Sequence, residues 1–263
     1  MPAKSNGVKA KKYLGQHFLE DPSVAERIVE AIQTEQPEAC ILEIGPGTGA
    51  LTRPLIQRFG LQVLALDIDE ESVRFLLQQA WVPTQCIKVG DFLRMPLERV
   101  ASSGPLVIVG NFPYNISSQI LFKFLDWKDH GIELVGMFQK EVAERVCADH
   151  GSKTYGILSV LVQVYYEAEY LFTVPPRVFN PPPKVNSGVL RLQRRTEWPE
   201  DVAYTDLKRL AKAAFNQRRK TLRNSLRAGG FDVDGIDEAT LKLRPEQLSP
   251  EAFVNLMRQL GSQ

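Results

Sequence analysis

Short apolar runs alternate along most of the chain with segments whose apolar residues recur at helical spacing. The apolar runs predict strands over residues 40–44, 61–66, 86–89, 106–109 and 132–139. The intervening periodicity predicts helices over residues 21–36, 51–59, 70–79, 118–124, 141–148 and 155–166. Strands that alternate with helices form a parallel sheet covered on both faces, so the pattern predicts an α/β domain.

The pattern changes toward the C-terminus. Two further strands, over 170–174 and 187–193, are joined by a proline-rich loop without a helix, which suggests an antiparallel pair at the sheet edge. Beyond residue 195 only helical periodicity remains. We therefore expect two domains, a larger one over 1–195 and a small helical one over 196–263.

Composition excludes several classes of protein. The chain has 263 residues, of which 44% are hydrophobic, enough for a large domain and a small one. No apolar run reaches membrane-spanning length, and the first residues lack the apolar core of a signal peptide. The three cysteines are scattered and the three histidines lack ligand spacing, so we expect a cytoplasmic monomer with neither disulfides nor a metal.

The net charge is only +1, but the cations are clustered. Residues 1–12 carry four lysines and no acid, which predicts a mobile basic arm, and residues 207–227 carry eight cations and no acid. On one helical wheel seven of those eight cations fall on an arc of about 120°, although Asn216–Gln217 could divide the segment into two helices. The alternative is a merely solvated charged face. With Lys184 of the proline-rich loop, the predicted RNA-contacting residues are Lys11, Lys12, Lys184, Lys212, Arg218, Arg219, Lys220, Arg223 and Arg227.

A glycine-rich turn, residues 43–49, lies between the first strand and the next helix. Gly45 and Gly47 let the backbone turn sharply and approach a ligand, and the following helix N-terminus adds donors. With Ala50 the turn also satisfies the dinucleotide-binding pattern. The carboxylate of Glu43 suits a ligand that carries ammonium and sulfonium charge better than a pyrophosphate. The turn therefore favours S-adenosylmethionine over a nicotinamide cofactor.

Acidic residues end the second and third predicted strands. Asp67 can accept hydrogen bonds from both ribose hydroxyls, and Asp91 from an adenine amino group. Their apolar neighbours Ile68 and Phe92 can sandwich an adenine ring. The alternative for each acid is a solvated helix cap.

The fourth predicted strand ends in Asn111-Phe112-Pro113-Tyr114. The Asn111 side-chain oxygen and the Phe112 backbone carbonyl can both accept hydrogen bonds from an aromatic amine, with the chain fixed by Pro113. Tyr114 offers one stacking face for a base taken out of its stack, and Phe179 of the proline-rich loop a second. The alternatives are a turn with a buried tyrosine and a crossover with a core phenylalanine.

Five segments together resemble the ribosomal RNA adenine N6-dimethyltransferase family, in particular its members that act on small-subunit rRNA. The resemblance covers nearly the whole chain, and the last two segments are its most specific marks. The segments are residues 15–19, 43–49, 111–117, 181–187 and 215–226.

The resemblance implies a Rossmann-like class I methyltransferase sheet of seven strands, mostly parallel with the last one antiparallel, and a small helical RNA-binding domain. It implies transfer of four methyl groups from S-adenosylmethionine to two adjacent adenosines, in a hairpin loop near the 3′ end of 16S rRNA within a precursor 30S subunit. Phe112 stands where the family often has Leu or Ile. Because the mechanism uses its backbone carbonyl, we expect activity to survive, although the bulkier side chain could alter how easily the second methyl group is accepted. By motif match, cofactor contacts fall on His17, Leu19, Gly45, Asp67, Asp91 and Asn111.

Three rival functions remain open. A large-subunit rRNA dimethyltransferase that confers macrolide resistance shares the first domain, but the match over 215–226 argues against it. An rRNA-binding assembly factor with a vestigial site is disfavoured by intact Gly45, Asp67, Asp91 and Asn111. A dinucleotide oxidoreductase is the third.

Overall fold

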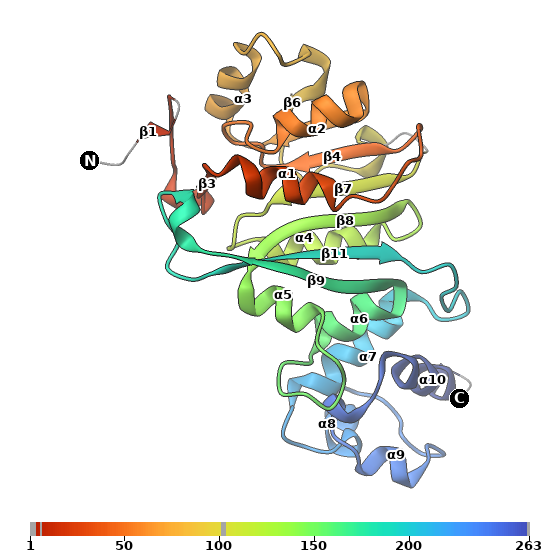
Figure 1. Ribbon diagram of the computed structural model, residues 1–263. Coiled ribbons are helices and arrows are strands. Elements are labelled where there is room, and N and C mark those ends of the chain that lie inside the picture. The colour runs from red at the N-terminus through yellow and green to blue at the C-terminus, as the bar shows by residue number, and fades with distance from the viewer. Residues whose placement is uncertain (1–3, 6, 101–103, 262–263) are drawn as a thin grey trace. The chain divides into compact units, whose positions relative to one another are not determined.

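The computed structural model describes residues 4–5, 7–100 and 104–261, and the chain divides into two compact units (Figure 1). The first unit comprises Met1–Ala143 and Glu169–Arg194, and the second Glu144–Ala168 and Arg195–Gln263. The expected boundary near residue 195 coincides with one division. Residues 144–168, expected in the first domain, lie in the second unit because α6 (Ile157–Tyr165) packs on α7 and α10.

The first unit contains a seven-stranded sheet in the order β6-β5-β4-β7-β8-β11-β9. Strands β4 to β8 are parallel to their neighbours, whereas β11 runs antiparallel to β8. The predicted fold class is therefore confirmed, with the last strand in sequence inserted between β8 and β9. The strands are β4 Cys40–Ile44, β5 Val63–Asp67, β6 Ile87–Val89, β7 Leu106–Asn111, β8 Gly131–Gln139, β9 Tyr166–Val174 and β11 Ser187–Arg194.

Helices cover both faces of this sheet, with α1 and α2 in front and α4 behind in the view of Figure 1. Apolar side chains of α1 and α2, such as Ile28 and Leu55, form one core with Ile41, Val107 and Val135 of the strands. The helix predicted over residues 21–36 ends at Glu30. The α-helices are α1 Pro22–Glu30, α2 Thr52–Phe59, α3 Glu70–Leu77, α4 Ser117–Asp126 and α5 Lys140–Val146, and the 3-10 helices are Lys12–Leu14, Gly60–Gln62, Thr84–Cys86, Leu97–Arg99 and Pro176–Val178.

Two small ribbons lie beside the main sheet. Strand β1 (Lys4–Ser5) pairs with β2 (Val8–Lys9), and β3 (Phe18–Leu19) pairs with β10 (Phe179–Asn180). Val8 is buried and β2 contacts α3, so residues 8–12 of the expected mobile arm are attached to the first unit. Residues 1–3 and 6 of that arm lie outside the described residues.

The second unit is helical. The basic segment forms two helices, α7 (Tyr204–Asn216) and α8 (Leu222–Ala228), so its cations do not share one helix face. Buried Leu207, Leu210 and Ala214 fix the inner face of α7. The remaining elements are α9 Glu238–Lys242, the 3-10 helix Pro245–Gln247 and α10 Pro250–Gly261. Over its described residues, the chain has no helix that is both long and apolar enough to cross a bilayer.

The end of β7 is shaped by the side chain of Phe112, which is 1% exposed. Its ring packs against Phe138, with centroids 4.9 Å apart, and fills the space above Gly110 and Gly136. A Cβ atom at Gly136 would lie 2.1 Å from Phe112 Cε2. The sheet therefore accommodates this large residue because two neighbouring positions have no side chain.

A second constraint is the burial of Glu43 at the end of β4, where the side chain is 1% exposed and its Oε2 atom has no hydrogen-bond partner. Burial, assisted by the nearby charge of Asp67, raises the pKa of Glu43 to about 8. The folded protein therefore favours the protonated acid at neutral pH.

We expect Gly136→Ala to lower the free energy of unfolding by about 1–3 kcal/mol because the added methyl overpacks the Phe112 ring. Phe112→Leu should remove the clash, so the double variant should be more stable than the sum of the two single effects predicts. Urea denaturation of all four proteins measures this coupling. Strictly additive effects would contradict the packing argument.

Glu43→Gln should change the pH dependence of stability. From the ordinary carboxyl pKa to about 8 the unfolded chain loses the Glu43 proton while the folded protein keeps it, so the wild type loses stability as pH rises. The stability of Glu43→Gln relative to wild type should then rise between pH 5 and 8, by at most roughly 1.4 kcal/mol per pH unit. Denaturation at several pH values tests this, with the exposed Glu26→Gln as control; parallel profiles for Glu43→Gln and wild type would refute it.

Candidate active site

A cavity opens at the carboxyl ends of the central strands β4, β5, β6 and β7. Its walls come from five chain segments, residues 14–19, 43–51, 66–68, 90–93 and 111–116. The predicted cofactor residues and the predicted target motif thus meet at one place. This is where ligands bind in open α/β sheets, because the strand order reverses between β4 and its neighbours β5 and β7.

The glycine turn forms the floor of the cavity. Gly45 has φ +70°, its N–H donates to the Leu66 carbonyl at 2.9 Å, and no atom lies within 4 Å of where its Cβ would be. Gly47 has φ +55°, and a Cβ there would lie 2.9 Å from the Phe18 ring. Both positions favour glycine on conformational grounds. A ligand can therefore approach the backbone at Gly45.

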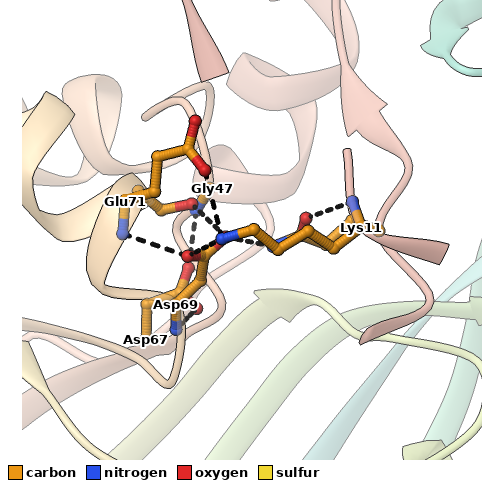
Figure 2. Close-up of polar contacts among 7 residues, drawn as sticks. Lys11, Gly47, Asp67, Asp69 and Glu71 are labelled. Carbon is orange, nitrogen blue, oxygen red and sulfur yellow. Dashed lines mark hydrogen bonds and ion pairs between the residues drawn. The ribbon is translucent and has the colours of Figure 1, made fainter. Parts of the chain in front are cut away.

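Asp67 lies at the centre of a polar network beside this turn (Figure 2). The carboxylate is 5% exposed; its Oδ2 accepts the Gly47 N–H at 3.2 Å and its Oδ1 the Asp69 N–H at 2.9 Å. Burial raises the pKa of Asp67. The residue that caps α3 is Asp69, which accepts the Glu71 N–H at 3.0 Å. Asp67 is therefore not the solvated helix cap of the alternative interpretation.

Lys11 attaches the N-terminal segment to this network (Figure 2). Its Nζ lies 2.5 Å from Asp69 Oδ1 and 3.2 Å from Glu71 Oε2, and Asp69 raises the pKa of Lys11. Gln16 Nε2 donates to Asp69 Oδ2 at 3.2 Å. The structure thus places Lys11, predicted to contact RNA, in an ion pair that holds a wall of the cavity, whereas Lys12 is exposed. Sequence reasoning missed Asp69, although an acid followed by two glutamates at a helix start indicates an N-cap.

The predicted adenine-binding residues all line the cavity. Asp91 Oδ1 accepts the Leu93 N–H at 2.9 Å, and its Oδ2 lies 3.4 Å from Arg94 Nε. The Phe92 ring is buried and packs edge-on against Trp127, whereas Ile68 is 53% exposed. Asp91 and Phe92 belong to one tight turn, which forms one wall of the cavity. Ile68 follows Asp67 and lies on another wall.

The orientation of the Asn111 amide is fixed by the N-terminal segment. Asn111 Nδ2 donates to the His17 backbone carbonyl at 2.8 Å, which leaves Asn111 Oδ1 as an acceptor. His17 is itself held, because its Nδ1 lies 2.7 Å from the Pro181 carbonyl oxygen and so carries the proton. Leu19 continues the segment along the cavity wall.

Tyr114 is held at both ends. Its hydroxyl shares a hydrogen bond with Ser187 Oγ at 2.7 Å, and its ring lies 5.6 Å from that of His17. Burial raises the pKa of Tyr114, so the phenol is neutral at physiological pH. The residue lines the cavity with Asn111 and Pro113, as the target motif requires.

Phe112 and Phe179, unlike Asn111, Pro113 and Tyr114, do not line the cavity. The Phe112 side chain faces Gly110 and Gly136 and does not line the cavity, so the expectation that its bulk alters the target pocket loses its basis. Phe179 is 3% exposed and packs in the apolar core; it is not among the cavity-lining residues, although its strand pairs with Leu19. Its stacking on a target base stays a prediction, and it would require local rearrangement of this core.

The predicted RNA-contacting cations of the second unit fall into two groups. Arg223 forms an ion pair with Glu238, Arg227 lies 3.4 Å from Asp234, and Arg218 donates to the backbone carbonyls of Lys153 and Tyr155. These acids lie beyond residue 230, outside the acid-free segment. In the other group, Lys212, Arg219 and Lys220 are exposed and form no ion pair with any described residue, and Lys184 of the first unit is exposed as well.

No cluster of three or more His, Cys, Asp or Glu residues that could hold a metal ion occurs in the described ranges 4–5, 7–100 and 104–261. The cavity instead combines buried carboxylates, an open glycine backbone and an oriented amide oxygen. This set can pair with a cationic, hydroxylated ligand and accept hydrogen bonds from an amine.

Known proteins resemble this chain over most of its length. The family model described as "Ribosomal RNA adenine dimethylase" matches residues 7–247. A protein of Bacteroides fragilis named "Ribosomal RNA small subunit methyltransferase A" is 49% identical over 254 residues, covering 96% of this chain and 93% of the relative. One of the same name from Cytophaga hutchinsonii is 47% identical over 258 residues, covering 97% and 98%.

Two solved structures share the fold of this chain. A dimethyladenosine transferase from Plasmodium falciparum superimposes with a TM-score of 0.75 at 24% identity, covering 94% of this chain and 98% of that one. The 23S rRNA methyltransferase ErmE superimposes with a TM-score of 0.65 at 26% identity, covering 93% and 99%. With a family model that spans most of the sequence and relatives close to half identical, the chain belongs to the ribosomal RNA adenine dimethylase family.

Proposed function

We propose that the protein transfers four methyl groups from S-adenosylmethionine to the N6 atoms of two adjacent adenosines near the 3′ end of 16S rRNA, within a precursor 30S subunit. The observation that carries this proposal is the orientation of the Asn111 amide: its nitrogen donates to the His17 carbonyl, which leaves its oxygen as an acceptor at the cavity. The protein acts in the cytoplasm as a monomer.

The cavity residues fit the methyl donor. In this proposal Asp67 binds the ribose hydroxyls, and Asp91 with Phe92 and Ile68 binds the adenine; their common position in the cavity lining supports these roles. Glu43 Oε2 is buried without a hydrogen-bond partner, so a cationic ligand beside it would favour the ionised carboxylate over the protonated acid, and Gly45 leaves room for close approach. Bound there, S-adenosylmethionine supplies an electrophilic methyl group.

The target motif solves a chemical difficulty. The N6 lone pair of adenine is delocalised into the ring, so the nitrogen is a poor nucleophile. Acceptance of its two hydrogens by Asn111 Oδ1 and the Phe112 carbonyl favours a pyramidal nitrogen and aims the lone pair at the methyl group. The alkylated nitrogen becomes acidic and loses a proton without a strong base. Tyr114, fixed by Ser187, offers a stacking face.

The small subunit is the favoured substrate. Relatives at 47–49% identity are named as small-subunit methyltransferases, whereas the similar 23S rRNA methyltransferase is 26% identical. The exposed cations Lys212, Arg219 and Lys220 of the second unit are placed to contact phosphates. An assembly-factor role without catalysis is disfavoured, because the cofactor residues and Asn111 surround one cavity.

We expect the purified protein to methylate unmethylated small subunits with labelled S-adenosylmethionine, giving dimethyladenosine at two adjacent positions near the 16S rRNA 3′ end. Asn111→Ala should lower the rate by on the order of 10²–10³-fold, because an oriented acceptor is lost, while RNA affinity changes little. Mapping of modified bases and single-turnover kinetics measure both effects.

Large-subunit RNA tested in parallel separates the rivals. Label on large-subunit RNA alone would keep the chemistry and overturn the substrate. Cofactor binding without transfer to either RNA would favour the assembly factor. An equal loss of rate and RNA affinity in Asn111→Ala would contradict the role of this side chain.

The cations of the second unit that form no ion pair with a described residue should contribute most to RNA binding. Replacing Arg219 and Lys220 together by alanine should reduce the slope of log affinity against log salt concentration by about 1–2, since two phosphate contacts are lost. The matched control, Arg223→Ala with Arg227→Ala, should change this slope less, because these side chains already pair with Glu238 and Asp234. A larger change of slope in the control than in the variant lacking Arg219 and Lys220 would indicate that Arg223 and Arg227 contact the RNA instead.

A further inference from the structure

Helix α4 connects the target motif to the adenine side of the cavity through Lys123. The helix begins at Ser117, three residues after Tyr114, and carries Lys123 in its last turn. Lys123 Nζ donates to the backbone carbonyls of Leu93 at 2.9 Å and Met95 at 2.8 Å. One ammonium group therefore holds the turn that follows Asp91.

The same ammonium also supports the aromatic part of this turn. It lies 5.7 Å from the centroid of the Phe92 ring and 4.9 Å from that of Trp127. The two rings meet edge-to-face with centroids 5.3 Å apart. Because Phe92 lines the cavity, Lys123 and Trp127 together form the support behind this cavity wall.

The turn itself is short and depends on few contacts. Asp91 accepts the Leu93 N–H through its side chain and the Arg94 and Met95 N–H groups through its backbone carbonyl, at 3.1 and 2.9 Å. These bonds fold the turn locally. At its start the turn is attached to β5, because the Gly90 N–H donates to the Asp67 carbonyl at 2.8 Å. Beyond Asp91 the Lys123 ammonium adds a second attachment, which bridges 28 to 30 residues of sequence.

Lys123 is partly buried, which is unusual for a lysine without an ion-pair role. Burial lowers the pKa of Lys123, and the charges of Asp126 and Asp91 oppose this effect. Hydrogen bonds between a charged donor and carbonyl acceptors are about twice as strong as neutral ones, so they offset the desolvation of the ammonium.

We infer that Lys123 is a positioning residue for recognition of the adenine of the methyl donor, because it fixes the turn that presents Asp91 and Phe92 to the cavity. The inference rests on the proposed function, since it concerns the same cofactor. Lys123 does not itself line the cavity. Through Asp91 it sets how strongly the site prefers an adenine to a purine without the amino group.

The test compares two ligands that differ at the amino group and, as a consequence, at the protonation of the adjacent ring nitrogen N1. Binding of S-adenosylhomocysteine and of S-inosylhomocysteine, whose ring has an oxygen in place of the amino group, is measured by calorimetry. Lys123→Met keeps the apolar stem and removes the ammonium. We expect its affinity for S-adenosylhomocysteine to fall by about tenfold, with a smaller loss for the inosine analogue.

Three further variants sharpen the experiment. Lys123→Arg retains a cation and donors and should recover part of the discrimination. Lys88→Met removes an exposed lysine of β6 near the same turn and should leave both affinities unchanged. In an Asp91→Asn background, Lys123→Met should cause little additional loss of discrimination, because both changes act on one contact.

The outcomes separate this inference from the proposed function. A wild-type protein that binds neither ligand would overturn both. Wild-type binding with equal losses of both ligands in Lys123→Met, or losses that add fully to those of Asp91→Asn, would overturn the positioning role alone. Thermal denaturation without ligand shows whether any variant fails to fold. If Lys123→Met fails to fold, the affinities of Lys123→Arg for the two ligands are compared with those of the wild type instead.

Discussion

The buried carboxylate of Asp67 joins the segments that surround the cavity. Its two oxygens accept the N–H groups of Gly47 and Asp69, so the glycine turn after β4 and the start of α3 are fixed to the end of β5. Asp69 in turn binds Lys11 and Gln16. The N-terminal segment that orients Asn111 is thereby attached to β5, the strand that ends in Asp67.

This arrangement is costly without a ligand. Glu43 and Asp67 are both buried, and burial raises the pKa of each carboxyl group. The charge of Asp67 raises the pKa of Glu43 further, and the charge of Asp69 acts in the same direction on Asp67. A cavity that concentrates desolvated acids is suited to a cationic, hydroxyl-bearing ligand, which supplies the missing partners. Such a polar cluster contributes little to folding stability and suits the binding of a ligand.

Strand positions, the glycine turn and the acids at the strand ends could be predicted because each depends on local pattern. Contacts between distant residues could not. Lys11 pairs with Asp69, 58 residues away, and Arg223 pairs with Glu238, 15 residues away. Counting acids within one segment therefore could not identify which cations are already paired and which can bind RNA. Phe112 faces Gly136 because of strand pairing between β7 and β8, a relation that hydrophobic periodicity does not contain.

The packing of Phe112 over two glycines has an evolutionary consequence. With a bulky ring at position 112, a side chain at position 136 is excluded by the 2.1 Å approach, whereas a smaller residue at 112 would free that position to vary. The residues at positions 110, 112 and 136 therefore constrain one another. A side chain at position 136 fits only after residue 112 has become smaller, so the order of these substitutions matters. Position 112, directly after the end of β7, is in this way constrained by β8, a strand that contributes no residue to the cavity lining.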